Sequence, residues 1–249
     1  MGFFQKLFRP GFIPVEEASY AALGVDLHSH FIPGVDDGAE TMEQSLEMLA
    51  GMQRLGFRKV VTTPHVMMDS FKNTPEIILN GLQNLREAVT EKGLTIQVEA
   101  GAEYMVDDGF EKIIADKTFL TFSNKYILIE LSTFMPHPNL KNMIFQLQLE
   151  GYKVVLGHAE RYSYWYRAFH EYEDLKNREV FFQVNTLSFG GFYNADYRKM
   201  AEKLAKLDMI DFLGSDMHRI QQEAGLAQCR KLPVVDHLIS SGRLMNPEL

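Results

Sequence analysis

The chain has 249 residues, a formal net charge of −8 and 46% apolar residues, so it is long enough for one α/β barrel or two small domains with a substantial core. The acidic balance argues against a general nucleic-acid binder, because phosphate contacts need clustered Lys and Arg. No apolar run approaches the roughly 20 residues that span a bilayer.

The only cysteine, Cys229, excludes an internal disulfide framework and favours a reducing cytoplasm as the location of the protein. A C-x5-R phosphatase loop would place its arginine at position 235, which is Val235. We therefore do not expect Cys229 to act as a nucleophile.

Residues 1–22 are interpreted as an N-terminal arm that precedes a single domain of residues 23–249. The arm carries the apolar residues Phe3, Phe4, Leu7 and Phe8. We expect it to pack on its own domain or on a neighbouring subunit of a homo-oligomer, and the alternative is contact with a membrane or a partner.

Strand-like and helix-like segments then alternate along the chain. The expected strands are Val25–His30, about Arg58–His65, Thr95–Tyr104, Tyr126–Ser132, Lys153–Glu160, Phe181–Thr186 and Asp211–His218. The segment after Tyr104 is expected to be irregular. About seven β/α units in this order predict a parallel sheet with helices outside it.

Several helices have recognisable beginnings and ends. Thr41 and Gln44 form a capping-box pattern at the start of the first helix. Pro75 follows the cap residue Thr74 in the second, whose expected buried face is Ile77, Ile78, Leu82, Leu85 and Val89. Further helices are expected at about Asn139–Glu150, at Asp196–Leu207 and from Pro233 to Gly242.

Five of the eight histidines lie at the ends of expected strands, each beside another potential metal ligand. His28 and His30 are two residues apart on a strand, so both imidazoles point to the same side. The complete set of candidate ligands is His28, His30, His65, Glu103, Glu130, His158, Asp216 and His218. The carboxyl ends of barrel strands open on one face, and only a closed or nearly closed barrel brings all of these residues together.

Each candidate ligand also has a plain structural interpretation. His65 could cap a turn, Glu103 and Glu130 could form salt bridges with lysines, and Asp216 could be a helix N-cap. Taken together these interpretations are poor, because they would bury several ionisable groups around one opening without positive partners. Divalent ions would supply that charge, and the sequence therefore predicts a metallohydrolase.

The motifs VDLHSHFIPGVDDGAE, TTPH, GAEY, ILIE, GHAERY and GSDMH, between Val25 and His218, resemble the PHP (polymerase and histidinol phosphatase) superfamily. Within it, the chain is most similar to the bacterial PHP-type protein-tyrosine phosphatases of capsule and exopolysaccharide synthesis. The resemblance implies a distorted (β/α)7 TIM-like barrel with three divalent metal ions. It also implies dephosphorylation of a bacterial tyrosine autokinase that controls polysaccharide export.

The resemblance also implies roles for individual residues. The eight candidate ligands match the metal ligands of the family, with Glu103 as the bridging carboxylate. Asp37, favoured over Asp36 because it directly precedes Gly38, resembles the catalytic Asp, and Arg161 matches an arginine that contacts phosphate. The family often has a second arginine a few residues after the D-x-H motif; here Arg219 follows at once and is the candidate for this second substrate contact.

The implied chemistry is attack on phosphorus by a metal-activated hydroxide, with charge on the phosphoryl oxygens offset by the ions and by Arg161. The tyrosyl oxygen would leave as a metal-stabilised phenolate or with help from Asp37. Imidazole ligands suit Zn, Fe or Mn, and the carboxylates favour Mn.

Other residues near the expected site have two interpretations each. Tyr162 and the aromatic residues after it could line a slot for a phosphotyrosine ring or pack the next helix. Asn185 could hydrogen-bond substrate or cap a turn. His137, His170 and His237 lie outside the pattern and are interpreted as non-ligands.

Two alternative functions remain open at this point. The same site could act on a small phosphomonoester such as histidinol phosphate. The chain could also be a non-catalytic regulator that binds a kinase through a structural metal site.

Overall fold

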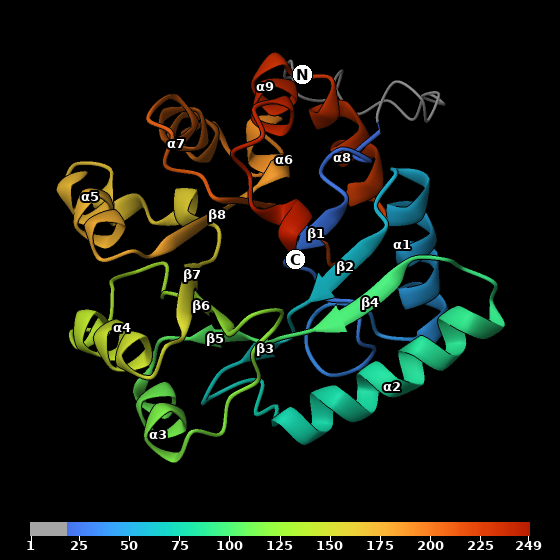
Figure 1. Ribbon diagram of the computed structural model, residues 1–249, viewed down its shortest axis with the longest axis horizontal. Coiled ribbons are helices and arrows are strands. Elements are labelled where there is room, and N and C mark those ends of the chain that lie inside the picture. The colour runs from blue at the N-terminus through green and yellow to red at the C-terminus, as the bar shows by residue number, and fades with distance from the viewer. Residues whose placement is uncertain (1–18) are drawn as a thin grey trace.

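The computed structural model describes residues 19–249, in which short parallel strands are surrounded by helices (Figure 1). The strands are β1 (Val25–Leu27), β2 (Lys59–Thr62), β3 (His65–Val66), β4 (Gln97–Ala100), β5 (Glu103–Met105), β6 (Tyr126–Glu130), β7 (Lys153–Leu156), β8 (Phe181–Asn185) and β9 (Phe212–Gly214). Only two residues separate β2 from β3, and only two separate β4 from β5. Each of these pairs is therefore one interrupted strand, and the described residues contain seven strand positions.

Neighbouring strands follow chain order around a curled sheet. β1 pairs with β2 and β2 with β4, while β3 pairs with β5 and the order continues from β5 through β6, β7 and β8 to β9, all in parallel. The first and last strands meet just beyond their ends, where the Asp216 amide donates to the His28 carbonyl (2.8 Å) and the His30 amide to the Met217 carbonyl (3.0 Å). The predicted distorted (β/α)7 barrel is confirmed.

The helices form the outer layer (Figure 1). They are α1 (Met42–Arg54), α2 (Pro75–Glu91), α3 (Asp108–Asp116), α4 (Leu140–Leu149), α5 (His170–Asn177), α6 (Thr186–Phe189), α7 (Ala195–Lys206), α8 (Gln222–Arg230) and α9 (Pro233–Ser240). No helix in residues 19–249 is long and apolar enough to cross a membrane.

Three details of the helices differ from the sequence prediction. The segment after Tyr104 contains α3, which begins where the Asp107 carboxylate accepts from the Phe110 amide at 2.9 Å. The capping box of α1 is only half formed, because the Gln44 side chain accepts from the amide of Glu40 and not from that of Thr41. Ile77 is 44% exposed and does not belong to the buried face of α2.

The chain enters the apolar core before the predicted end of the arm. Tyr20 is fully buried, and its ring stacks on Phe57 with 4.9 Å between ring centroids. The Tyr20 hydroxyl donates a hydrogen bond to the Leu226 carbonyl at 2.7 Å. Phe3, Phe4, Leu7 and Phe8 lie outside the described residues, so the role of the arm stays a prediction.

Gly214, at the end of β9, leaves room for its neighbours inside the barrel. A Cβ at this position would collide with the Leu27 carbonyl oxygen and with the Gln183 side-chain amide. We expect Gly214→Ala to lower the free energy of unfolding by about 1–3 kcal/mol, the usual cost of overpacking. Denaturant unfolding measures this change, and an unaltered midpoint would mean that the barrel interior yields easily at this point.

Candidate metal centre

The barrel brings all eight predicted ligands to one place at the carboxyl ends of its strands. Their donor atoms fall into overlapping groups, within each of which the atoms lie no more than 4.8 Å apart. The groups are His30, Asp37, His65 and His218; His28, His30 and Asp216; His28, Glu103 and His158; and His65, Glu103 and Glu130. Because four residues belong to two groups each, the eight predicted ligands form one continuous cluster of nine residues with Asp37, which the sequence predicted as a catalytic residue and not as a ligand.

Glu103 lies at the centre of this cluster and is fully buried. Its Oε2 is 3.0 Å from His28 Nε2 and 3.1 Å from His65 Nδ1, and its Oε1 is 2.9 Å from His158 Nε2. Each carboxylate oxygen thus faces different imidazoles. This is the arrangement that a carboxylate needs in order to bridge two ions.

Asp216 and Glu130 complete the set of buried carboxylates. Asp216 Oδ1 is 3.4 Å from His28 Nε2 and 3.5 Å from His30 Nε2. Glu130 Oε1 is 2.8 Å from His65 Nδ1. The carboxylates therefore lie between the imidazoles rather than beside lysine side chains.

Several buried nitrogen and oxygen atoms of the cluster, each able to bind a metal ion, have no hydrogen-bond partner. They are Nε2 of His28, Nε2 of His30 and both carboxylate oxygens of Glu103. Such atoms are costly unless a ligand satisfies them, since burial removes them from water. Imidazole nitrogens and carboxylate oxygens are also the donors that first-row divalent metals take, so the residues present fit a metal centre.

The buried carboxylates of the cluster give it negative charge that a bound cation would neutralise. Burial disfavours the protonated form of His28, but the carboxylates of Glu103 and Asp216 outweigh burial and raise its pKa to about 10. Burial likewise opposes ionisation of Glu103, and the charges on His28 and His65 hold its pKa well below the usual range. Without an ion, protons on the imidazoles must offset the carboxylates, and metal binding would displace these protons.

Three of the candidate ligands have a backbone conformation that favours glycine. The φ angles are 84° at His28, 32° at His158 and 49° at Asp216. Non-glycine residues in this region cost of order 1–3 kcal/mol and gather at functional sites. All three lie just beyond the ends of strands, namely β1, β7 and β9.

The two aspartates of the loop after β1 have different surroundings. The side chain of Asp36 is buried, and its carboxylate accepts from His30 Nδ1 at 2.7 Å and from the backbone amide of His65 at 3.1 Å. Asp37 is 59% exposed, and its Oδ1 lies 3.4 Å from His218 Nε2 and 3.5 Å from His65 Nε2. Contact with His218 lowers the pKa of Asp37, and the Asp37 carboxylate belongs to one of the ligand groups.

The two candidate arginines also differ. Arg161 Nη1 donates to Asp216 Oδ2 at 3.2 Å, and its guanidinium lies 5.5 Å from the centroid of the Tyr193 ring. Its Nε is buried without a partner. The Nη1 of Arg219 instead donates to the carbonyls of Asp37 and Gly38, both at 2.6 Å, so this side chain holds the Asp36–Asp37 loop in place.

Tyr162 and Asn185 are both buried. The Tyr162 hydroxyl accepts from the Leu131 amide at 3.0 Å and donates to the Gly157 carbonyl at 3.1 Å, which favours packing over contact with a substrate ring. Asn185 Nδ2 donates to Asp216 Oδ2 at 2.7 Å. Asn185 therefore contacts a candidate ligand directly.

The sequence analysis did not single out Gln183. Its Oε1 accepts from His28 Nδ1 at 2.9 Å and from the His158 amide at 2.8 Å. A polar residue in the apolar run FFQVNT, two positions from Asn185 and so on the same side of the strand, was the available signal.

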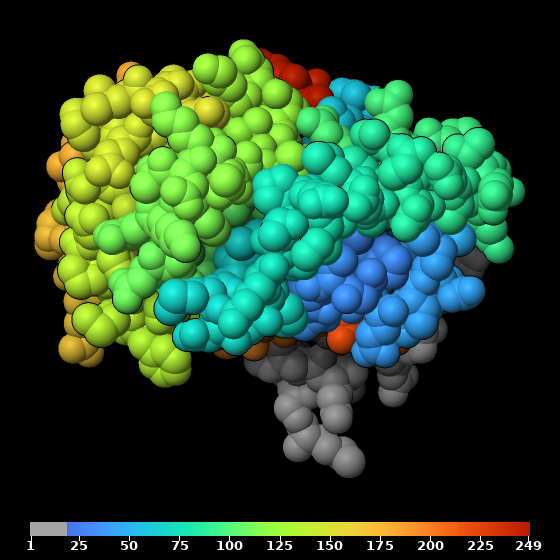
Figure 2. All heavy atoms as spheres, turned by 90° about the horizontal axis from the view of Figure 1, so that it is seen from below, coloured from blue at the N-terminus to red at the C-terminus, as the bar shows by residue number. Residues whose placement is uncertain are grey.

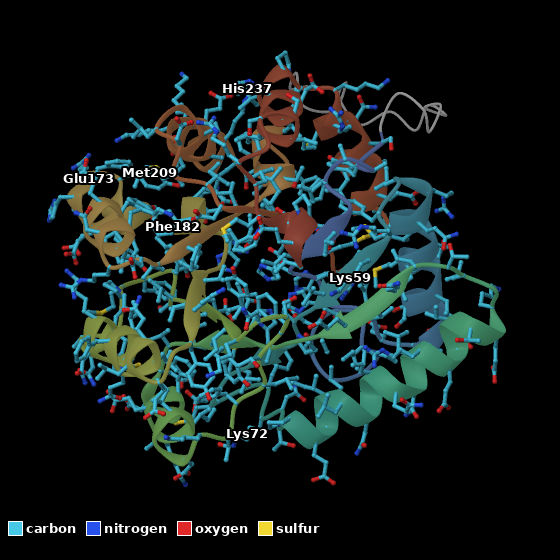
Figure 3. All side chains as sticks on the ribbon, in the orientation of Figure 1. Lys59, Lys72, Glu173, Phe182, Met209 and His237 are labelled. Carbon is cyan, nitrogen blue, oxygen red and sulfur yellow. The ribbon has the colours of Figure 1, made fainter. Side chains whose placement is uncertain are left out.

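Histidines outside the pattern lie apart from the cluster. His137 is paired with Asp108 at 3.0 Å, His170 begins α5, and His237 is on α9 (Figure 3). None of these three is among the ligand groups found in residues 19–249.

An α/β barrel that gathers imidazoles and carboxylates at the carboxyl ends of its strands has the architecture of a metal-dependent hydrolase. The chain belongs to the capsular polysaccharide synthesis family CpsB/CapC, whose model matches residues 24–234. The family assignment agrees with the resemblance to PHP-type phosphatases.

Named relatives and a solved structure support the same assignment. The tyrosine-protein phosphatase YwqE of Bacillus subtilis is 26% identical over 198 residues, which cover 79% of this chain and 78% of the relative. The tyrosine-protein phosphatase CpsB of Streptococcus pneumoniae is 27% identical over 202 residues, covering 79% and 83%. A chain from the crystal structures of YwqE and CpsB, described as unique metal-dependent tyrosine phosphatases, superimposes with a TM-score of 0.79 at 25% identity, covering 90% of each chain.

Proposed function

We propose that this protein hydrolyses phosphotyrosine on proteins, and that its substrate is a bacterial tyrosine autokinase that regulates capsule or exopolysaccharide synthesis. The observation that carries the proposal is the continuous cluster of nine nitrogen and oxygen ligands in a chain of the CpsB/CapC family. The single cysteine is consistent with a cytoplasmic location, where such a kinase would present its phosphotyrosines.

The proposed cofactor is a set of three divalent ions, with Mn favoured and Fe or Zn as the alternatives. The nine residues of the cluster would hold them, with Glu103 shared between ions. When bound, divalent ions supply positive charge to the phosphoryl oxygens and a water of lowered pKa as the nucleophile.

The protein side chains would position the substrate for this reaction. Arg161 is anchored beside Asp216 and over the Tyr193 ring, and its planar fork suits two phosphoryl oxygens. Asp37 contributes an exposed carboxylate at the mouth, on a loop that Arg219 holds through backbone carbonyls. We assign Asp37 a role in the reaction itself. Arg219 is assigned only the role of holding the loop that carries Asp37.

A groove beside the cluster favours a polypeptide substrate over a small phosphomonoester. This cavity of about 990 Å³ lies between α2 and α3, and two segments of its wall, Val66–Met68 and Tyr104–Met105, directly follow His65 and Glu103. Apolar side chains such as Phe110 and Phe119 line it. Figure 2 faces this side, with the start of α2 in teal beside α3 in green.

Exposed lysines line the groove and would attract acidic residues of the substrate that flank its phosphotyrosine. Lys72 and Lys112 line it, and Figure 3 labels Lys72 between α2 and α3. We expect Lys72→Glu with Lys112→Glu to raise KM for a phosphotyrosyl protein by about 2- to 10-fold, since an exposed ion pair contributes roughly 0.2–1 kcal/mol. Hydrolysis of p-nitrophenyl phosphate should be unchanged.

The matched control for this prediction is Lys92→Glu with Lys206→Glu, which changes the net charge equally and away from the groove. If both double variants raise KM to the same degree, long-range charge accounts for the effect and the groove does not.

The proposed function is tested by comparing substrates with the Mn²⁺-loaded protein. We expect kcat/KM for a phosphotyrosyl peptide to exceed that for a phosphoseryl peptide of the same sequence and that for histidinol phosphate. Equal or faster turnover of histidinol phosphate would favour the small-phosphomonoester alternative. Full metal loading with no hydrolysis of any phosphoester would favour the non-catalytic regulator.

A further inference from the structure

Strand β8 places two side-chain amides inside the barrel, next to the metal centre. Gln183 and Asn185 are both fully buried and are two positions apart, so they point to the same side of the strand. Their neighbour Phe182, labelled in Figure 3, belongs to the apolar core. Two buried amides on one strand need a reason, because each must satisfy its donors and acceptors within the protein.

The two amides bond to each other, and the backbone amide of His158 fixes the orientation of Gln183, because an N–H needs an oxygen acceptor. Gln183 Nε2 donates to Asn185 Oδ1 at 2.9 Å. The remaining oxygen, Oε1, then accepts from His28 Nδ1 and from the backbone amide of His158, at 2.9 and 2.8 Å. Because an amide oxygen only accepts, His28 must carry a proton on Nδ1, and its Nε2 is left to face the cluster.

Asn185 in turn fixes the orientation of a second candidate ligand, Asp216. Its oxygen is taken by Gln183, so its Nδ2 is the group that donates to Asp216 Oδ2 at 2.7 Å. This contact directs the other oxygen, Oδ1, toward the imidazoles, 3.4 Å from His28 Nε2. A closed circuit of contacts thus runs from His28 through Gln183, Asn185 and Asp216 back to His28.

The barrel makes room for this circuit. Gly214 pairs with Asn185 in the register of β8 and β9, and a Cβ there would meet the Gln183 amide. The amides also join residues from strands far apart in sequence, since His28 follows β1, His158 follows β7 and Asp216 follows β9.

We propose that Gln183 and Asn185 are positioning residues of the metal centre. Gln183 fixes the tautomer of His28 so that an ion binds through Nε2, and Asn185 fixes the rotamer of Asp216 so that an ion binds through Oδ1. The inference rests on the proposed metal centre and concerns residues to which no metal-binding role has been assigned. Loss of such an outer partner costs about 10–100-fold in metal affinity.

The test measures Zn²⁺ affinity and the His28 tautomer in the full chain. Zn²⁺ is the probe because it is diamagnetic, so histidine-selective ¹⁵N labelling shows the Nδ1–H of His28 as a slowly exchanging signal. We expect Gln183→Leu to weaken Zn²⁺ binding by about 10–100-fold and to lose this signal. Gln183→Glu, which keeps an acceptor for His28, should retain the signal.

Asn185→Leu separates the two roles. It leaves the contact between His28 and Gln183 in place, so we expect weaker Zn²⁺ binding with the His28 signal retained. If Gln183→Leu does not fold, the Zn²⁺ affinity of Asn185→Leu and the His28 signal of Gln183→Glu test the proposal.

Asn246 offers a matched control for the loss of a buried amide. Its side chain bridges Val25 and Leu213, on β1 and β9, at the other end of the barrel. Asn246→Leu should lower the unfolding temperature without changing Zn²⁺ affinity. Zn²⁺ affinity that is unchanged in folded Gln183→Leu and Asn185→Leu would overturn the proposal.

Two outcomes for the unsubstituted protein separate this proposal from the proposed function. Normal Zn²⁺ binding with no phosphotyrosine hydrolysis would contradict the function, and the positioning roles would still be decided by the variants. A protein that binds no Zn²⁺ would overturn the positioning proposal itself.

Discussion

Glu103→Gln is expected to abolish phosphatase activity and to weaken metal binding by more than the roughly 10–100-fold that the loss of an outer partner causes. The two oxygens of Glu103 face His28, His65 and His158 at 2.9–3.1 Å. Glutamine removes the negative charge and replaces one of these oxygens with a donor that cannot bind a cation. Metal content by mass spectrometry and initial rates on a phosphotyrosyl peptide measure the two effects.

Glu99→Gln is the matched control for this substitution. Glu99 lies on β4, the first half of the same interrupted strand, and its carboxylate pairs with Lys59 and accepts from the Ser123 amide. This variant should keep its metal and its activity. A Glu103→Gln protein that retained both would contradict the assignment of the cluster as the catalytic metal centre.

Arg161→Lys is expected to lower kcat/KM for phosphotyrosyl substrates by about 10²–10³-fold, the usual effect of removing one preorganised donor to developing charge. Burial opposes the charge on Arg161, but Asp216 keeps its pKa raised, so the guanidinium stays protonated. Lysine keeps the charge but loses the planar fork that fits two phosphoryl oxygens. Steady-state kinetics together with metal content separate a substrate role from a metal role.

Arg167→Lys provides the comparison, because Arg167 is an exposed arginine only six positions along the chain. Its kinetics should match those of the unsubstituted protein. If Arg161→Lys lost metal along with activity, its contact with Asp216 would be the cause, and the arginine would support the metal centre rather than the substrate.

Much of the barrel could be predicted because its strands are apolar runs that end at recognisable turn residues. The expected strand Tyr126–Ser132 became β6, and the expected strand Phe181–Thr186 became β8. The prediction missed α3, which buries only two apolar side chains, Phe110 and Ile114. A short helix with so few buried residues gives a weak periodic signal.

The ligand residues could be predicted because side chains at equivalent strand ends must converge in a barrel. The contacts around them could not, because they depend on rotamers and on residues far apart in sequence. The contact of Arg219 with the loop carbonyls of Asp37 and Gly38 joins segments about 180 positions apart. Tyr162 follows His158 closely in sequence, yet only the fold shows that its ring is buried.

We expect a metal centre, and not the cysteine, to carry the hydrolysis of phosphotyrosine. The most direct test of this is the rate on a phosphotyrosyl peptide before and after chelation, beside a sample treated with a thiol alkylator. Burial raises the pKa of Cys229 to about 12, so this thiol is neither exposed nor ionised at neutral pH. We predict that chelation abolishes activity, that Mn²⁺ restores it and that alkylation has no effect, whereas activity that survives chelation and is lost on alkylation would contradict the account.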